Sequence, residues 1–302
     1  MMCLTEKRLT DVYEKAEKIC FDNTDRIVLM SDCHRGAGNW GDNFLRNQTL
    51  FYAALRYYFG NGFTYIELGD GDELWENRKL ENILQVHGDA LEMMSRMYCR
   101  GRFYMIFGNH DKKKRSRKYL MRRCRVCRSD MTEDSLELFP DMTVREGIVL
   151  SQRGTGNQIL LTHGHQGELL NDVLWPAARF LVRHVWRRLE LTGVQDPTST
   201  AKNYRRKQSR ERALSRWAED QGIMLIAGHT HRPALPPPGA GLYANDGSCV
   251  HPRCITAIEI ERGALSLVKW STLTRPDRTL YVGRELMAGP YPVRDYFQEE
   301  KR

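Results

Sequence analysis

Histidine, aspartate and asparagine residues recur in five short motifs along this chain, and their side chains are common metal ligands. The motifs are Asp32-Cys33-His34, Gly69-Asp70, Gly108-Asn109-His110-Asp111, His163-Gly164-His165 and Gly228-His229-Thr230-His231. Imidazole with carboxylate or amide oxygen suits Mn, Fe or Zn, whereas a site for Mg or Ca alone would be nearly all oxygen. Two such ions about 3.5–4 Å apart bind phosphate oxygens and generate hydroxide near neutral pH. The motifs therefore predict hydrolysis at phosphorus.

Each motif follows an apolar run that favours a β-strand. The runs are residues 27–30, 63–68, 103–107, 159–161 and 223–227. Because α/β sheets place their chemistry where strands end, we expect residues as distant as Asp32 and His231 to gather in one cluster. A single His at a strand end is usually a satisfied polar group, but six of the nine histidines fall inside these motifs. That concentration favours a metal centre.

Strand and helix patterns alternate along the chain. Amphipathic helices are expected near residues 5–20, 43–59 and 81–99, a hairpin at 143–150 and 158–161, and further strands at 242–244, 254–261 and 265–270. The early alternation is βαβ-like and favours parallel pairing, and the later strands would complete a second sheet. We therefore expect an α/β fold with two sheets flanked by helices, in one domain over residues 1–302, with a C-terminal extension at 271–302.

This ordered set of motifs resembles the calcineurin-like metallophosphoesterase superfamily, with its D-x-H, GD, GNHD, H and GHxH blocks. The resemblance implies an α-β-β-α sandwich and two divalent metal ions, for which we expect Mn2+, with Fe or Zn as alternatives. One ion would be held by Asp32, His34 and His231, the other by Asn109, His163 and His229, and Asp70 would bridge them. His110 would contact the phosphate and stabilise or protonate the leaving group, and Asp111 would orient the His110 imidazole.

Within the superfamily, three blocks are similar to the UDP-2,3-diacylglucosamine pyrophosphohydrolases of lipid A synthesis. Residues 31–36, 69–75 and 228–233 resemble their SDxHxG, GDxxExW and GHTHRP blocks. The resemblance implies cleavage of the pyrophosphate in a nucleotide-diphospho-lipid or nucleotide-diphospho-sugar conjugate, with Glu73 and Trp75 supporting the ligands. Two residues depart from that branch, which has Arg at the position of His110 and often Asp at the position of His165. We expect His165, like Glu73 and Trp75, to support the ligands.

Residues 168–221 form a stretch that a minimal fold would not need, and they are expected to be two helices broken at residues 192–197. This insertion is either a helical hairpin with a solvated basic face or a lid whose apolar side covers a lipid or sugar. In the lid interpretation its basic residues bind phosphate. The candidates are Arg179, Arg183, Arg187, Lys202, Arg205 and Arg206. A second basic run, residues 112–118, reads as a solvated helix face beside the site.

The net charge of +8 over 302 residues fits an anionic partner, which we expect to be a phosphate-containing small molecule, lipid-linked in the leading interpretation. A nuclease, or a general phosphomonoesterase or phosphodiesterase, is the alternative and would need an open basic groove, so nucleic acid stays open as a partner. A scaffold that lost its chemistry would show gaps among the ligands, and every ligand position is filled.

No apolar run approaches the roughly 20 residues of a membrane span, and the N-terminus lacks the apolar core of a signal peptide. We therefore expect a cytoplasmic protein, with peripheral contact at the inner membrane surface if the substrate is a lipid. The eight cysteines have irregular spacing, which favours reduced thiols. Cys124 and Cys127 are expected to be free cysteines on a helix.

Overall fold

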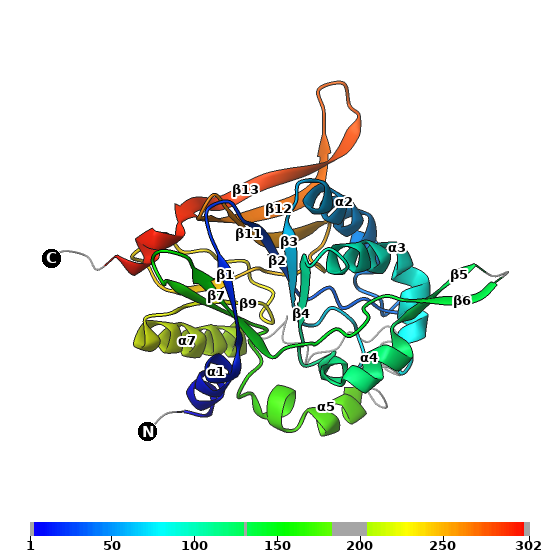
Figure 1. The fold of residues 1–302 in the computed structure, drawn as a ribbon, viewed down its shortest axis with the longest axis horizontal. Coiled ribbons are helices and arrows are strands. Elements are labelled where there is room, and N and C mark those ends of the chain that lie inside the picture. The colour runs from blue at the N-terminus through cyan, green and yellow to red at the C-terminus, as the bar shows by residue number, and fades with distance from the viewer. Residues whose placement is uncertain (1–2, 130–131, 183–203, 299–302) are drawn as a thin grey trace.

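The computed structural model of the protein describes residues 3–129, 132–182 and 204–298, and for residues 125–129, 132–136 and 204–206 it describes the backbone alone. The chain forms four layers, in the order helices, sheet, sheet, helices (Figure 1). The expected α/β class and α-β-β-α sandwich are therefore confirmed.

The larger sheet has six strands in the order β13-β12-β11-β2-β3-β4. Their bounds are Arg26–Met30 (β2), Thr64–Leu68 (β3), Phe103–Ile106 (β4), Cys254–Glu261 (β11), Ala264–Thr274 (β12) and Leu280–Pro292 (β13). Strands β2, β3 and β4 pair in parallel, as their alternation with helices predicts. The remaining pairs are antiparallel. Because β2, β3 and β4 run the same way, the residues that follow them meet at one edge of the sheet.

The second sheet has five strands in the order β1-β7-β8-β9-β10. Their bounds are Glu17–Phe21 (β1), Gly147–Gln152 (β7), Gln158–Thr162 (β8), Met224–Ala227 (β9) and Tyr243–Asn245 (β10). Strands β7 and β8 are antiparallel neighbours, which confirms the expected hairpin. Strands β8, β9 and β10 are parallel, so the loops after β8 and β9 leave the sheet side by side.

Helices cover the outer face of each sheet, and a small hairpin projects beside them (Figure 1). The helices are α1 (Leu4–Lys15), α2 (Gln48–Gly60), α3 (Leu80–Tyr98), α4 (Arg117–Arg123), α5 (Trp175–Leu181) and α7 (Tyr204–Gln221). Shorter helical turns are η1 (Leu45–Asn47), η2 (Lys112–Arg115), η3 (Leu169–Val173) and η6 (Val293–Phe297), and the small hairpin pairs β5 (Arg125–Ser129) with β6 (Thr132–Glu137).

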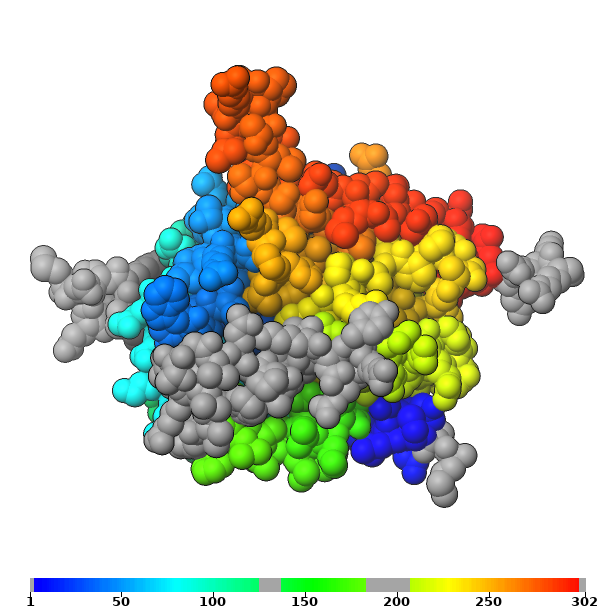
Figure 2. Space-filling model, turned by 180° about the vertical axis from the view of Figure 1, so that it is seen from behind, coloured from blue at the N-terminus to red at the C-terminus, as the bar shows by residue number. Residues whose placement is uncertain are grey.

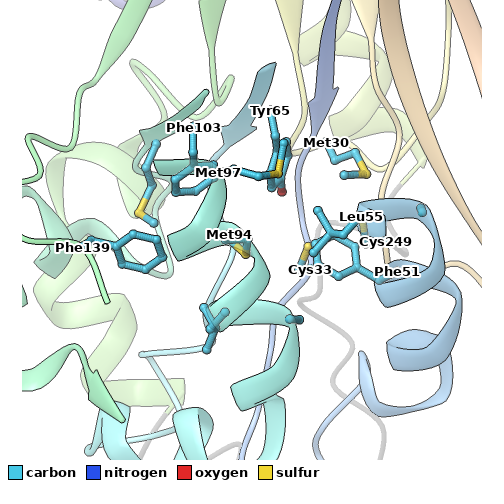
Figure 3. Packing of buried hydrophobic residues seen from close by; sticks show 14 of the residues in the cluster. Met30, Cys33, Phe51, Leu55, Tyr65, Met94, Met97, Phe103, Phe139 and Cys249 are labelled. Atoms are coloured by element: carbon cyan, nitrogen blue, oxygen red, sulfur yellow. The ribbon is translucent and has the colours of Figure 1, made fainter. Parts of the chain in front are cut away.

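Three apolar clusters fill the spaces between the layers, because successive strand residues point to opposite faces. In β2, Val28 and Met30 face the cluster under α2 and α3, whereas Leu29 faces the cluster between the two sheets. Figure 3 shows Met30 with Phe51 of α2 and other members of the first cluster. Burial of this apolar surface stabilises the fold by roughly 25 cal/mol per Å2.

The N-terminal helix is shorter than expected. A helix was predicted over residues 5–20, but α1 ends at Lys15 and Glu17–Phe21 is strand β1, paired in parallel with β7. Ile19 and Phe21 pack into the cluster between the sheets, at the two-residue spacing of a strand. The charged residues around Ile19 and Phe21 are the reason that the sequence pattern favoured a helix there.

The predicted C-terminal extension at residues 271–302 is, in its described part, a structural element of the large sheet. Strand β12 continues to Thr274, and β13 pairs with it along its length as the edge strand. The far end of this hairpin projects beyond the body of the protein (Figure 2). The two strands are therefore integral to the sandwich at one end and project from it at the other.

The predicted insertion at residues 168–221 divides into two parts. Helix α7 packs on the five-stranded sheet, where Leu214 and Trp217 are buried against α1 and β9. It is a body helix, so the lid prediction concerns only the segment before it, of which residues 183–203 lie outside the described residues. No helix in the described parts of the chain is long and apolar enough to cross a membrane. Cys124 is a buried free thiol at the end of α4, but Cys127 falls in strand β5 rather than on a helix.

Candidate metal centre

The five motifs lie in loops directly after β2, β3, β4, β8 and β9. Three of these strands belong to the six-stranded sheet and two to the five-stranded sheet. The site therefore forms at one end of the sandwich, where loops from both sheets meet. Ion-pair distances join residues from different loops: His163 contacts Asp70, and His231 contacts Asp32. The expected cluster of distant residues is therefore present.

The backbone at the ligand positions is strained. Positive φ angles occur at Asp32 (51°), His34 (46°), Asp70 (49°), His229 (65°) and His231 (53°). Non-glycine residues rarely adopt this left-handed region, and strain of this kind concentrates at functional sites, where the surrounding structure holds it. Five of the seven expected ligands are strained in this way.

Two glycines permit the close approach of these loops. A Cβ on Gly108 would lie 2.1 Å from Oδ1 of Asp70, and one on Gly228 would lie 2.6 Å from Oδ2 of Asp32. Both distances are far below van der Waals contact, so the loops can pack together only because glycine has no side chain. The glycines of the motifs thus bring the backbone up to the ligands.

The first group of donor atoms comprises Asp32, His34 and His231. Nε2 of His231 lies 3.0 Å from Oδ1 of Asp32, and Nε2 of His34 lies 3.6 Å from the same oxygen. The other Asp32 oxygen accepts a hydrogen bond from the backbone N–H of His229 (2.8 Å). Burial acts to raise the pKa of Asp32, but the nearby imidazoles hold it well below its usual range.

The second group comprises Asp70, His163 and His229. Nε2 of His163 lies 3.1 Å from Oδ2 of Asp70, and the other ring nitrogen lies 2.8 Å from the Leu68 carbonyl oxygen, which fixes the ring orientation. Asp70 also lies 3.9 Å from Nε2 of His34, so it stands between the two groups. That is the position a bridging ligand requires.

Several buried polar atoms in this cluster lack a hydrogen-bond partner. Among them are Oδ1 of Asp32, Oδ1 of Asn109 and Nε2 of His163, all from expected ligands. A buried polar atom without a hydrogen-bond partner costs about 1–3 kcal/mol, so unpaired atoms at these positions fit a site that binds an ion. The donor set of imidazole, carboxylate and amide oxygen fits divalent metals. Its residues would hold two ions, and the ions would bind phosphate oxygens and activate water.

His110 is held at the rim of the cluster by two neighbours. Its Nδ1 lies 2.7 Å from Oε2 of Glu73, and its ring stacks on Trp75 with centroids 4.2 Å apart. The Glu73 carboxylate also contacts Nδ1 of His34 (3.0 Å), and Trp75 Nε1 donates to the Asn109 carbonyl oxygen (2.7 Å). Glu73 and Trp75 therefore support both a ligand loop and the expected catalytic imidazole.

Asp111 does not contact the His110 imidazole, so its expected role is corrected. Its carboxylate instead accepts hydrogen bonds from the backbone N–H of Gly71 (3.1 Å) and Gly108 (2.7 Å) and pairs with Lys114 (3.1 Å). These contacts tie the loops after β3 and β4 together. The orienting contact that the sequence assigned to Asp111 is made by Glu73.

The family model of calcineurin-like phosphoesterases matches residues 25–233, which include all five motifs. The chain belongs to this family. It is therefore a metal-dependent phosphoester hydrolase. The roles of individual ligands, including the bridging role of Asp70, stay predictions. No curated protein sequence matches the chain significantly.

Solved structures similar to this phosphoesterase share little sequence with it. A predicted phosphoesterase from Streptococcus pneumoniae TIGR4 is 15% identical, with a TM-score of 0.36, over 87% of this chain and 97% of that chain. Vps29 from Chaetomium thermophilum is 11% identical, with a TM-score of 0.41, over 89% and 98%. A putative 5′-nucleotidase from Staphylococcus aureus is 15% identical, with a TM-score of 0.34, over 89% and 54%.

His165 lies beneath the cluster of this phosphoesterase. It is completely buried, and its ring centroid is 5.4 Å from that of His163. Neither ring nitrogen has a hydrogen-bond partner, and burial lowers its pKa well below the usual range. A neutral imidazole at this position packs behind a ligand without adding charge, and its supporting role stays a prediction.

Helix α7 contributes two basic residues that are not among the site candidates from the sequence. The buried guanidinium of Arg210 donates to the carbonyl oxygens of Gly164 (2.7 Å) and Gln166 (2.6 Å), which fixes the loop after β8. One turn earlier, Lys207 is only 6% exposed, and its charge acts on Asp32 and His231. In the sequence, the spacing of three residues between Lys207 and Arg210 places both on one helix face, and this spacing could have indicated the pair.

The structure describes only some of the predicted phosphate-binding residues. Arg179 is half-buried on α5, and its guanidinium lies over the Trp175 ring, 4.8 Å from the centroid. Arg205 and Arg206 fall in the first turn of α7, where only the backbone is described. The other three candidates, Arg183, Arg187 and Lys202, lie outside the described residues. All six assignments stay predictions.

Proposed function

We propose that this phosphoesterase cleaves the pyrophosphate of a nucleotide-diphospho conjugate that carries an apolar group, of the UDP-2,3-diacylglucosamine type, at a centre of two Mn2+ ions. The observation that carries the proposal is an exposed apolar surface beside the donor atoms. It begins one residue after Glu168, whose Oε1 lies 3.2 Å from Nε2 of His229. It comprises Leu169 (61% exposed), Leu170 (51%), Val173 (51%) and Leu174 (43%).

An apolar surface so close to a phosphate-binding centre fits a substrate that joins phosphate to acyl chains. A simple phosphomonoester would leave these apolar side chains in water without a function. Such a substrate is carried in a membrane, so this interpretation also supports a cytoplasmic protein with peripheral membrane contact at this surface.

The protein's own residues would act on the phosphate in distinct ways. His110, whose Nδ1 faces Glu73, would present its other ring nitrogen to the leaving-group oxygen and stabilise or protonate it. Glu73 would hold the ring in this orientation, since its carboxylate lies 2.7 Å from Nδ1. Lys207 would offset negative charge on the substrate from the side of α7.

The internal ion pairs of the basic run at residues 112–118 argue against the nuclease alternative. Lys112 pairs with Asp172 (2.8 Å), and Lys114 pairs with Asp72 (2.7 Å) deep inside the protein. The predicted solvated face is therefore wrong for these two lysines, which are neutralised internally and unavailable to a nucleic acid backbone.

Phosphorus NMR of Mn2+-loaded protein with UDP-2,3-diacylglucosamine tests the proposal. We expect UMP to be released by the wild type and not by Asp70→Asn, which weakens the shared ligand. Hydrolysis of bis(p-nitrophenyl) phosphate without UMP release would reject the lipid conjugate and retain the phosphoesterase. If Asp70→Asn keeps the wild-type rate on either substrate, the assignment of the centre is wrong.

A further inference from the structure

Trp40 exposes almost its whole indole ring to solvent, although it follows closely on the first motif of the metal centre. It is 96% exposed, the highest value among the large apolar residues in the described parts of the chain. Indole rings ordinarily cover apolar surface in a core or an interface. Trp40 belongs to none of the five motifs, and the ligand and acid–base roles above do not involve it.

The turn that carries Trp40 is held firmly by hydrogen bonds. The backbone N–H of Asp42 donates to the Asn39 carbonyl oxygen (2.9 Å), so Trp40 lies at the corner of a closed turn. The buried Asp42 carboxylate accepts a hydrogen bond from the backbone N–H of Gly38 (3.0 Å) and lies 2.9 Å from Nε2 of His87 on α3. The indole is therefore presented to solvent by a fixed backbone.

The same turn lies at the rim of the metal centre. It belongs to the loop after β2, which also carries the first motif. A Cβ on Gly41 would lie 3.2 Å from Oε2 of Glu76, so this turn touches the loop after β3. Glu76 directly follows Trp75, whose ring stacks on His110. Trp40 therefore borders the side of the centre on which His110 lies.

The apolar surface that would bind acyl chains lies elsewhere on the rim. It begins beside Glu168, which contacts His229 of the second donor group. That surface is aliphatic and is formed by η3. The centre is thus bordered by two different apolar features, a group of aliphatic side chains and a single aromatic ring.

An exposed indole beside a phosphate-binding centre suits a flat ring that is joined to the phosphate. Every nucleobase has a π-face, and stacking on an aromatic side chain depends little on which base it is. A membrane surface is a poorer partner, because interfacial binding needs further apolar or basic side chains. The exposed residues that flank Trp40 supply none, since they are Gly38, Asn39 and Asn43.

We propose that Trp40 stacks on the nucleobase of the substrate and so selects nucleotide conjugates over phosphate compounds without a base. This inference rests on the proposed function, in which a nucleotide supplies the base. The aliphatic surface would then bind the acyl chains and Trp40 the base, with the pyrophosphate between them at the donor atoms.

Calorimetric titration of Mn2+-loaded protein with UMP and with ribose 5-phosphate tests the proposal, because only UMP carries a base. Stacking on an aromatic ring corresponds to about 5- to 100-fold in a dissociation constant, so the wild type should prefer UMP by about that factor. In Trp40→Ala the two dissociation constants should become about equal, and Trp40→Phe, which keeps a flat ring, should retain part of the preference. Tyr281→Ala, an exposed aromatic on the projecting hairpin, is the matched control and should keep the wild-type preference.

Three results would overturn the proposal. They are a wild type without a preference for UMP, an undiminished preference in Trp40→Ala, and equal weakening of both compounds in Trp40→Ala, which would place the effect on the phosphate. If the preference is undiminished and Trp40→Ala loses binding to phosphatidylglycerol vesicles, the indole is a membrane anchor instead.

The proposed function is judged by a separate measurement, the release of UMP from UDP-2,3-diacylglucosamine. Release by the wild type, together with an undiminished UMP preference in Trp40→Ala, rejects the role of Trp40 and leaves the proposed function standing. A preference that depends on Trp40 without such release rejects the lipid conjugate and retains recognition of the base.

Discussion

At the scale of single residues, His110 offers the clearest separation between catalysis and metal binding. Its side chain is 22% exposed, more than the 17% of His231 and the 13% of His34, and Glu73 and Trp75 hold it in place. We expect His110→Ala to lower kcat by about 10²–10⁴-fold, the usual contribution of a general acid, with two metal ions retained. Turnover of bis(p-nitrophenyl) phosphate and elemental analysis of the same preparation measure both quantities.

The expected role of His110 in catalysis would be wrong if His110 were itself a metal ligand. His110 lies close enough to His34 and Asp70 to share a metal with them. If His110→Ala loses one equivalent of metal, His110 is a ligand and its role as a proton donor is wrong.

Lys207 is the second residue whose role can be measured directly. The residue is nearly buried, and it forms no ion pair with a carboxylate among the described residues. A charged hydrogen bond is worth about 1.5–3 kcal/mol, so Lys207→Met should raise KM for a phosphate ester by about tenfold or more. Lys118→Met, on the exposed side of α4, is the control. An unchanged KM in Lys207→Met would show that the lysine serves only the packing of α7.

At the scale of elements, the site depends on how closely the loops after β3 and β4 approach each other. Gly108 lacks a positive φ, so alanine is conformationally allowed there and only the contact with Asp70 changes. We expect Gly108→Ala to lose Mn2+ binding and to lower the free energy of unfolding by about 1–3 kcal/mol, as overpacking does. Gly88→Ala is the matched control, since nothing lies within 4 Å of its added Cβ.

Calorimetric titration and urea unfolding of the two alanine variants measure Mn2+ binding and the free energy of unfolding. Alanine within α3 should leave metal binding unchanged and unfolding unchanged or slightly harder. If Gly108→Ala binds Mn2+ with wild-type affinity, the loops adjust freely and the close approach is not what shapes the site.

The order of the elements also explains which parts of the site were predictable. Asp32, Asp70 and Asn109 each follow an apolar strand, so local pattern and parallel pairing suffice to bring them together. Glu168 and Arg210 meet only because α7 packs on the five-stranded sheet, and no local pattern encodes that packing. The burial of Lys114 was also not predictable from local pattern, because its partner Asp72 belongs to the loop after β3.

At the scale of the whole molecule, protonation and metal binding are both linked to the stability of the fold. In the metal-free protein, burial acts to lower the pKa of His163, but the carboxylates of Asp70 and Asp32 raise it from 6.5 to about 9. The folded state therefore holds a proton that the unfolded chain releases above pH 6.5. The stability that this proton provides is fully present below pH 6.5 and is lost as the pH rises towards 9.

Metal binding reverses this dependence, because a ligand imidazole must be deprotonated and each bound ion displaces protons. We expect the Tm of chelator-treated protein to fall between pH 6.5 and 9, and the increase in Tm on adding Mn2+ to grow over the same interval. His163→Gln removes the titrating group, so its metal-free Tm should change less across this interval than that of the wild type. A metal-free wild type whose Tm is flat or rises from pH 6.5 to 9 would contradict the buried pairing of His163 with Asp70, on which the second ligand group depends.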